Sequence, residues 1–140
     1  MKKQRVYIGP VEISGFFANL ANAMRSNGVD ATFISFSEHQ YNYKVLDDSF
    51  LIHWIKRFSH NVINSAAVIK VFWQIIREIA IFAFFLKAIF RYDVFIFVYG
   101  NSLLRGNVDL PILRLLGKRI IFNLSMGSEA RPPYIDGSYQ

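Results

Sequence analysis

The feature that most constrains the fold is an unbroken run of β-branched and aromatic residues over positions 94–99. A strand with one face in water alternates apolar and polar residues. This run has no polar break, which is typical of a strand buried on both faces of a parallel sheet. Gly100 and Asn101 then end the run. The sequence therefore predicts an interior strand of an α/β domain here.

A helix and a second strand follow this run. Pro111 is tolerated in the first turn of a helix, Leu113 supplies an apolar position, and Gly117 is placed as a left-handed C-cap. Residues 119–124 predict another strand, which leads into the polar, glycine-bearing segment 125–131. Ligands of open α/β sheets bind at the carboxyl ends of strands, so we expect this segment beside a binding site.

The N-terminal part predicts a second strand–helix–strand unit. Residues 13–27 place apolar side chains at helical spacing, and Ser14 is a candidate N-cap. Short strands are expected on either side. Together the two units predict a Rossmann-like α/β domain with flanking helices and a mostly parallel sheet of about four or more strands. The expected strands are residues 5–9, 31–36, 94–99 and 119–124.

The loop between the first strand and the first helix carries glycine at both ends, Gly9 and Gly15. Free N–H groups at a helix N-terminus suit a phosphate or a carboxylate. Glycine's backbone freedom also explains a plain tight turn. We favour the tight turn, because Glu12 would repel an anion; anion binding is the alternative.

Residues 49–92 predict two helices. Residues 50–58 fit one helical face, and residues 59–61 and 64–65 mark a break after it. Residues 67–91 predict one long helix. The polar, tyrosine-rich residues that precede position 49 predict an irregular loop.

The long helix is apolar on every side over residues 79–86. Arg77, Glu78 and Lys87 interrupt the apolar run well before the roughly 20 residues that a membrane-spanning helix needs, so we expect no span. Two alternatives remain open, burial between the sheet and another layer or contact with an anionic membrane surface. In the second case the cations that meet the head groups are Lys70, Arg77, Lys87 and Arg91.

Lysine and arginine outnumber aspartate and glutamate by 16 to 10, so an anionic partner is expected, either phospholipid head groups, phosphorylated lipids, nucleotides or nucleic acid. The absence of cysteine excludes disulfides and thiolate metal ligands. His53 and His60 have no carboxylate or third histidine at ligand spacing, and the pair Asp47 and Asp48 is typical of capping or solvated acids. We therefore expect no metal.

Five short motifs follow one another in the second half of the chain. They are Tyr92-Asp93-Val94, Tyr99-Gly100-Asn101-Ser102, Asp109-Leu110-Pro111, Leu116-Gly117-Lys118-Arg119 and Gly127-Ser128-Glu129-Ala130-Arg131. In order and spacing they resemble the second half of the N-terminal domain of GT-B-fold glycosyltransferases, of the group 1, retaining type. The unit at residues 5–36 is similar to the first half of that domain.

The resemblance departs from the family pattern at two positions. Met126 stands where many members carry a histidine, and a thioether neither acts as a base nor donates a hydrogen bond. Glu129 stands in for the usual aspartate. Ser128 and Arg131 match the family loop. They either hold a phosphate or sugar hydroxyl or anchor the loop itself.

Within that family the N-terminal domain binds mainly the acceptor, and a second domain binds the nucleotide sugar. The resemblance implies that residues 1–140 are one domain, the incomplete acceptor-side part of such an enzyme, inactive without a donor-binding domain or separate chain. We expect residues 132–140 to be a loop that is cut mid-course.

Several further expectations follow from the resemblance. They are a sugar or a lipid-linked, cell-envelope acceptor, a position at the cytoplasmic face of the membrane, no cofactor in this chain and no nucleic-acid partner. Catalytic residues are not identified. The residues expected to line the substrate cleft are Gly9, Ser14, Gly15, Tyr99, Asn101, Ser102, Gly127, Ser128, Glu129 and Arg131. A non-catalytic module that binds a membrane or an anion is the alternative function.

Overall fold

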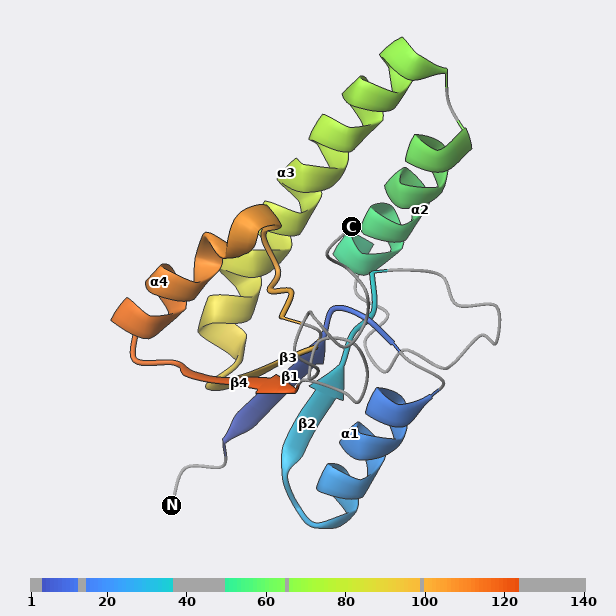
Figure 1. The fold of residues 1–140 in the computed structure, drawn as a ribbon. Helices are drawn as coiled ribbons and strands as arrows, with labels where there is room; N and C mark the ends of the chain where they lie inside the picture. Colours follow the sequence, from blue (N-terminus) through green and yellow to red (C-terminus); the bar gives the residue numbers. More distant parts are fainter. Residues whose placement is uncertain (1–3, 13–14, 37–49, 65, 99, 124–140) are drawn as a thin grey trace, which may run out of the picture.

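The computed structural model describes residues 4–12, 15–36, 50–64, 66–98 and 100–123. These residues form a four-stranded, all-parallel sheet with the strand order β2-β1-β3-β4 (Figure 1). The strands are β1 (Arg5–Gly9), β2 (Asp30–Phe33), β3 (Val94–Val98) and β4 (Arg119–Asn123). The predicted Rossmann-like α/β fold is thereby confirmed.

Helices flank the sheet on both faces (Figure 1). On one side lies α1 (Phe16–Ser26). The other side carries an antiparallel hairpin of α2 (Phe50–Asn64) and α3 (Ala67–Arg91), together with the short 3-10 helix η1 (Arg105–Asn107) and α4 (Asp109–Leu115). We call the four elements on this side the hairpin layer.

The sheet alternates its side chains between two cores. On the α1 side, Val6, Ile8 and Ile96 pack against helix residues such as Phe17. On the hairpin side, aromatic residues dominate, and the rings of Tyr7 and Phe95 lie 5.7 Å apart. All five residues of β3 are buried, which confirms the prediction that this run is covered on both faces.

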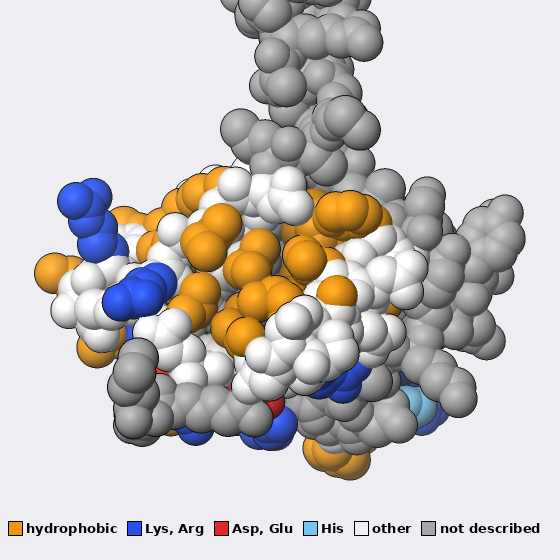
Figure 2. Space-filling model, turned by 90° about the horizontal axis from the view of Figure 1, so that it is seen from below, with side chains coloured by type: hydrophobic (Ala, Val, Ile, Leu, Met, Phe, Trp, Pro, Cys, Tyr) orange, Lys and Arg blue, Asp and Glu red, His pale blue; other side chains and the backbone are white. Residues whose placement is uncertain are grey.

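Among the described residues, α1 is the only helix on the sheet face opposite the hairpin layer, and it does not extend over β4 (Figure 1). The register pairs Ile96 with Ile121, so Ile121 points to this face, and it is 49% exposed. Figure 2 shows apolar side chains gathered over the middle of the same face, with lysines and arginines at its margin.

Asp93 links the amino ends of three strands through its side chain and its backbone. Asp93 accepts a hydrogen bond from the backbone N–H of Arg5 at 3.1 Å, and its own N–H and carbonyl group bond to Arg5 and Arg119. The bond from the Arg5 N–H, supported by the Arg5 and Lys118 side-chain charges, lowers the pKa of Asp93. The carboxylate therefore stabilises this sheet edge in its charged form.

The helix ends follow from two glycines. After α4, the N–H of Gly117 bonds to Arg114 and the N–H of Lys118 to Leu113, the paired bonds of a Schellman motif. Gly117 has a positive φ of 68°, which confirms its prediction as a left-handed C-cap. Gly28 ends α1 in the same way.

The predicted break between the two helices is confirmed after Asn64, but its earlier part at residues 59–61 is wrong, because α2 continues to Asn64 before α3 begins at Ala67. The hydroxyl of Ser59 donates to the carbonyl oxygen of Ile55 at 2.9 Å, so this polar residue is satisfied inside the helix. One residue before it, Phe58 stacks on Trp73 of α3 with ring centroids 5.7 Å apart. Packing against α3 therefore stabilises the helical conformation of this polar segment of α2.

Long as it is, α3 contacts the rest of the described chain along only one side. No helix among the described residues has an apolar run long enough to cross a membrane, in agreement with the sequence prediction. The helix is also not sandwiched between two layers of described residues, because large apolar side chains on its outer side are exposed. Of the two sequence alternatives, complete burial does not hold within this part of the chain.

Candidate functional site at the carboxyl edge of the sheet

The strand order places a topological switch point between β1 and β3. From β1 the chain moves to β2 on one side, and it later returns to β3 and continues to β4 on the other side. Crevices for ligands form at the carboxyl ends of the two strands that flank such a point. At these ends, Gly9 is the last residue of β1 and Pro10 follows it, and Gly100 and Asn101 lie in the loop after β3.

Gly9 is required by close packing. A Cβ atom at this position would lie 2.3 Å from the backbone carbonyl oxygen of Ile34 and 2.6 Å from the hydroxyl oxygen of Tyr7. Burial raises the pKa of the Tyr7 hydroxyl well above its ordinary value, so Tyr7 stays neutral and acts as a core residue. The absence of a side chain at Gly9 thus allows Ile34 and Tyr7 to pack closely against the end of β1.

The start of α1 already holds a carboxylate. Buried Glu12 accepts hydrogen bonds from the backbone N–H groups of Phe17 and Ala18, at 3.2 and 3.0 Å. Gly15 precedes the helix with a φ of 77°, and Ser14 lies outside the described residues. Glu12 therefore takes the position that an external anion would occupy, which favours the tight-turn interpretation of this loop.

After β3, an internal hydrogen-bond network shapes the loop. Ser102 is buried, and its hydroxyl lies within hydrogen-bonding distance of the carboxylate of Asp109 and, at 2.9 Å, of the amide oxygen of Asn107. Asp109, fully buried, also accepts the N–H of Leu103 at 3.0 Å. Ser102 therefore anchors this loop, whereas its neighbour Asn101 is exposed.

Two hollows open at this edge. One, of about 530 Å³, extends from the end of β1 between α2 and α3, and its lining includes Pro10, Lys56, His60 and Arg77. The other, of about 380 Å³, lies at the end of β3, and its lining residues include Gln74, Arg77, Asn101, Ser102 and Arg105. The second hollow has mostly polar groups on its surface.

Arg77 lines both hollows. Its side chain is 31% exposed, and Nη2 donates to the carboxylate of Glu78 at 2.7 Å. Its Nε is buried and has no hydrogen-bond partner within the described part of the chain. The sequence placed Arg77 with the membrane cations. The structure sets it apart from them, because Lys70, Lys87 and Arg91 are exposed on α3.

Sequence analysis did not select Lys56 or Arg105 for the site. Lys56 lies on α2 and Arg105 lies in η1, and neither is part of a short sequence motif. Only the strand order and the hairpin bring them to the same edge as Arg77. Among the predicted cleft residues, Tyr99 and the segment containing Gly127, Ser128, Glu129 and Arg131 lie outside the described residues.

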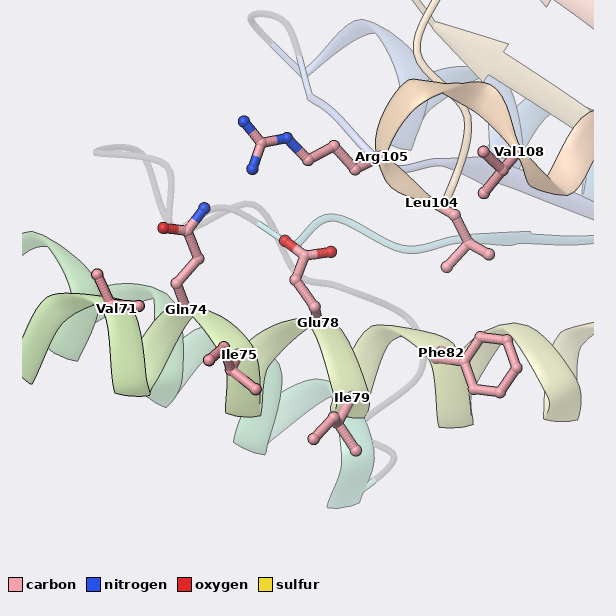
Figure 3. Close-up of a pocket in the computed structure, with 9 residues that line it drawn as sticks. All are labelled: Val71, Gln74, Ile75, Glu78, Ile79, Phe82, Leu104, Arg105 and Val108. Atoms are coloured by element: carbon pink, nitrogen blue, oxygen red, sulfur yellow. The ribbon is translucent and has the colours of Figure 1, made fainter.

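The hairpin layer carries a second surface feature. A groove of about 670 Å³ runs between α3 and η1, and Figure 3 shows its lining side chains, with those of Glu78 and Arg105 on opposite walls. Val71, Ile75 and Phe82 make its α3 wall largely apolar. The groove continues into the exposed outer side of α3.

None of the known family models, curated proteins or solved structures matches the chain significantly. Within the described residues, no three histidine, aspartate or glutamate side chains come together as metal ligands.

Proposed function

We propose that the chain is the acceptor-binding N-terminal part of a glycosyltransferase, which moves a sugar from a nucleotide sugar to a lipid-linked or cell-envelope acceptor at the cytoplasmic membrane face. The observation that carries the proposal is the position of the two hollows. Both lie at the carboxyl edge of a parallel sheet, on either side of its switch point, where α/β domains bind ligands.

One motif that resembles the family lies at the same edge, because Gly100, Asn101 and Ser102 follow β3. The motif at residues 127–131 lies outside the described residues, and the motifs around Asp93, Asp109 and Gly117 lie elsewhere in the domain. The donor-binding domain of this family is a second Rossmann-like unit. The proposed activity therefore requires a partner domain or a separate chain.

The test is a transfer assay on material that is recovered with the tagged chain from lysate of its native cells. Nucleotide sugars serve as donors and membrane extract as the acceptor source. We expect sugar transfer in the presence of a co-purifying donor-binding polypeptide and none with the purified chain alone. Recovered material that never transfers sugar, with any donor, would contradict the proposal.

A second candidate function, an anionic-membrane-binding module, is favoured by the outer side of α3. Eight large apolar residues, spaced so that they share one side of the helix, are exposed by 45% to 85%. They are Val68, Val71, Phe72, Ile75, Ile79, Phe82, Leu86 and Phe90. We call this set the outer face of α3. An apolar surface of this extent on a domain is typical of a docking surface.

The positive charge of this part of the chain favours an anionic bilayer as the partner of the outer face of α3. The described residues from 50 to 123 contain ten lysines and arginines against three acids, a difference of seven, whereas the whole chain has a net charge of +6. Of the acids, Glu78 pairs with Arg77, Asp93 pairs with Arg5, and Asp109 is buried. A second copy would bring like charges together, whereas anionic lipids attract them.

Sedimentation with vesicles tests this second function. The purified chain should sediment with vesicles of phosphatidylcholine and phosphatidylglycerol at low salt and be released as salt screens the attraction. Sedimentation with pure phosphatidylcholine should be much weaker. Equal binding to both vesicle types, or none to the anionic ones, would remove the membrane function.

A further inference from the structure

We propose that Arg77, Lys56 and Arg105 form a binding site for a phosphate group at the switch point. The inference deepens the proposed function, on which it rests for the role of the ligand, by naming the acceptor's chemical class as a phosphate ester or diphosphate. It also removes Arg77 from the set of predicted membrane-contact residues.

Three separate elements supply the cations. Lys56 lies on α2 and shares the first hollow with Arg77, which lies on α3. Arg105 lies in η1 and shares the second hollow with Arg77. Because Arg77 lines both hollows, a ligand that contacts its guanidinium from either side meets a second cation there.

The hydrogen bonding of Arg77 leaves donors for such a ligand. A guanidinium has five N–H donors arranged in a rigid fork, and the described residues give Nε no acceptor although this atom is buried. Only one ion pair, from Nη2 to Glu78, is present among the described partners of this side chain. Because 31% of the Arg77 side chain is exposed, the terminal N–H groups that Glu78 does not use remain donors for an oxyanion in either hollow.

Phosphate fits the charge and shape better than a carboxylate or a neutral sugar. Three cations against the single carboxylate of Glu78 leave an excess of two positive charges around the two hollows. A phosphate monoester carries between one and two negative charges at neutral pH. Its oxygens also spread in several directions, so an arginine fork can bind two of them while others face Lys56 or Arg105.

The start of α1 does not compete for this ligand. Glu12 occupies the N–H groups of that helix, so a phosphate at the switch point depends on side-chain cations instead. The side chains proposed to bind the phosphate therefore all lie on the hairpin layer.

The test titrates inorganic pyrophosphate into the purified full chain at low salt, with isothermal calorimetry and amide NMR shifts as readouts. We expect binding with shifts near Arg77. Arg77→Gln should weaken it about tenfold or more, because charge-assisted bonds to a partly buried guanidinium are lost. The matched control is Arg57→Gln, which removes an equal charge from an exposed position of α2 outside both hollows and should leave the affinity nearly unchanged.

A second variant keeps the proposal testable if Arg77→Gln folds poorly. Glu78→Gln removes the carboxylate that competes for Arg77, so pyrophosphate should bind several-fold more tightly. Absence of pyrophosphate binding overturns the proposal. So does an equal loss with Arg57→Gln, because binding then reflects total charge, and so does unchanged or weaker binding with Glu78→Gln.

Phosphatidylcholine vesicles with and without a polyprenyl diphosphate distinguish a lipid-borne phosphate from a soluble one. Recruitment that needs the diphosphate and is lost in Arg77→Gln assigns a lipid acceptor, and binding of free pyrophosphate alone assigns a soluble one. The transfer assay tests the transferase function independently of the phosphate site. Pyrophosphate binding at Arg77 without any sugar transfer keeps the phosphate site and removes the transferase function.

Discussion

Ile79→Ser is the substitution that most sharply probes the outer face of α3. Ile79 lies near the middle of this face and is 63% exposed, so its replacement removes apolar contact with a bilayer without opening a core cavity. Complete burial of such a side chain contributes about 1.5–3 kcal/mol, and the exposed fraction of Ile79 corresponds to about 1–2 kcal/mol of it. The partition constant for anionic vesicles should fall about 5- to 30-fold.

The assay is sedimentation with phosphatidylcholine and phosphatidylglycerol vesicles at a series of lipid concentrations. Phe16→Ser is the matched control, because Phe16 is 55% exposed and lies on α1, on the opposite side of the sheet (Figure 1). Its partition constant should stay at the wild-type value. The free energy of unfolding of Ile79→Ser should remain within about 0.5 kcal/mol of the wild type, as is usual for exposed positions.

Two results would refute this reasoning. If Phe16→Ser weakens vesicle binding as much as Ile79→Ser does, the interaction is not confined to the hairpin layer. If Ile79→Ser binds as well as the wild type while salt still abolishes binding, charge alone drives the association and the apolar face takes no part.

Three further predictions concern the fold. Gly9→Ala should destabilise the domain by at least about 3 kcal/mol in chemical unfolding, because its Cβ meets a backbone carbonyl oxygen at 2.3 Å, whereas Gly117→Ala, with open space around it, should cost about 1–2 kcal/mol. Asp109→Asn should cost about 1–3 kcal/mol, because it impairs a buried hydrogen-bond network. The lowered pKa of Asp93 means that its carboxylate stabilises the fold above its unfolded value of 3.8, and this contribution is lost as the pH falls through the lowered pKa. Asp93→Asn should therefore be less stable than the wild type at neutral pH and converge with it in strong acid; a constant difference across the acid range would exclude the Arg5 contact as the cause.

Local patterns were sufficient to predict most of the fold. The strand at β3 follows from a run of apolar residues with no polar break, and all of its described residues are buried. Gly117 follows from the need for a left-handed residue after a helix. Both depend on neighbours close in sequence, which is why the sequence is informative about them.

The errors arose where distant contacts decide the outcome. Ser59 looked like a helix breaker, but its hydroxyl bonds within the helix while Phe58 packs on Trp73. Arg77 was predicted as a membrane cation, which stays a prediction, and its position between two hollows follows only from the fold. Lys56 and Arg105 reach the same edge only through the hairpin and the strand order.

The most direct test of the central claim compares variants in the sugar-transfer assay. Material recovered with wild-type chain, Arg77→Gln or Arg57→Gln is supplied with nucleotide sugar and membrane extract under identical conditions. A carboxyl-edge acceptor site predicts that Arg77→Gln raises the acceptor KM about tenfold or more, while Arg57→Gln keeps the wild-type value. Equal KM values for Arg77→Gln and the wild type, or no transfer by any sample, would contradict an acceptor site at this edge.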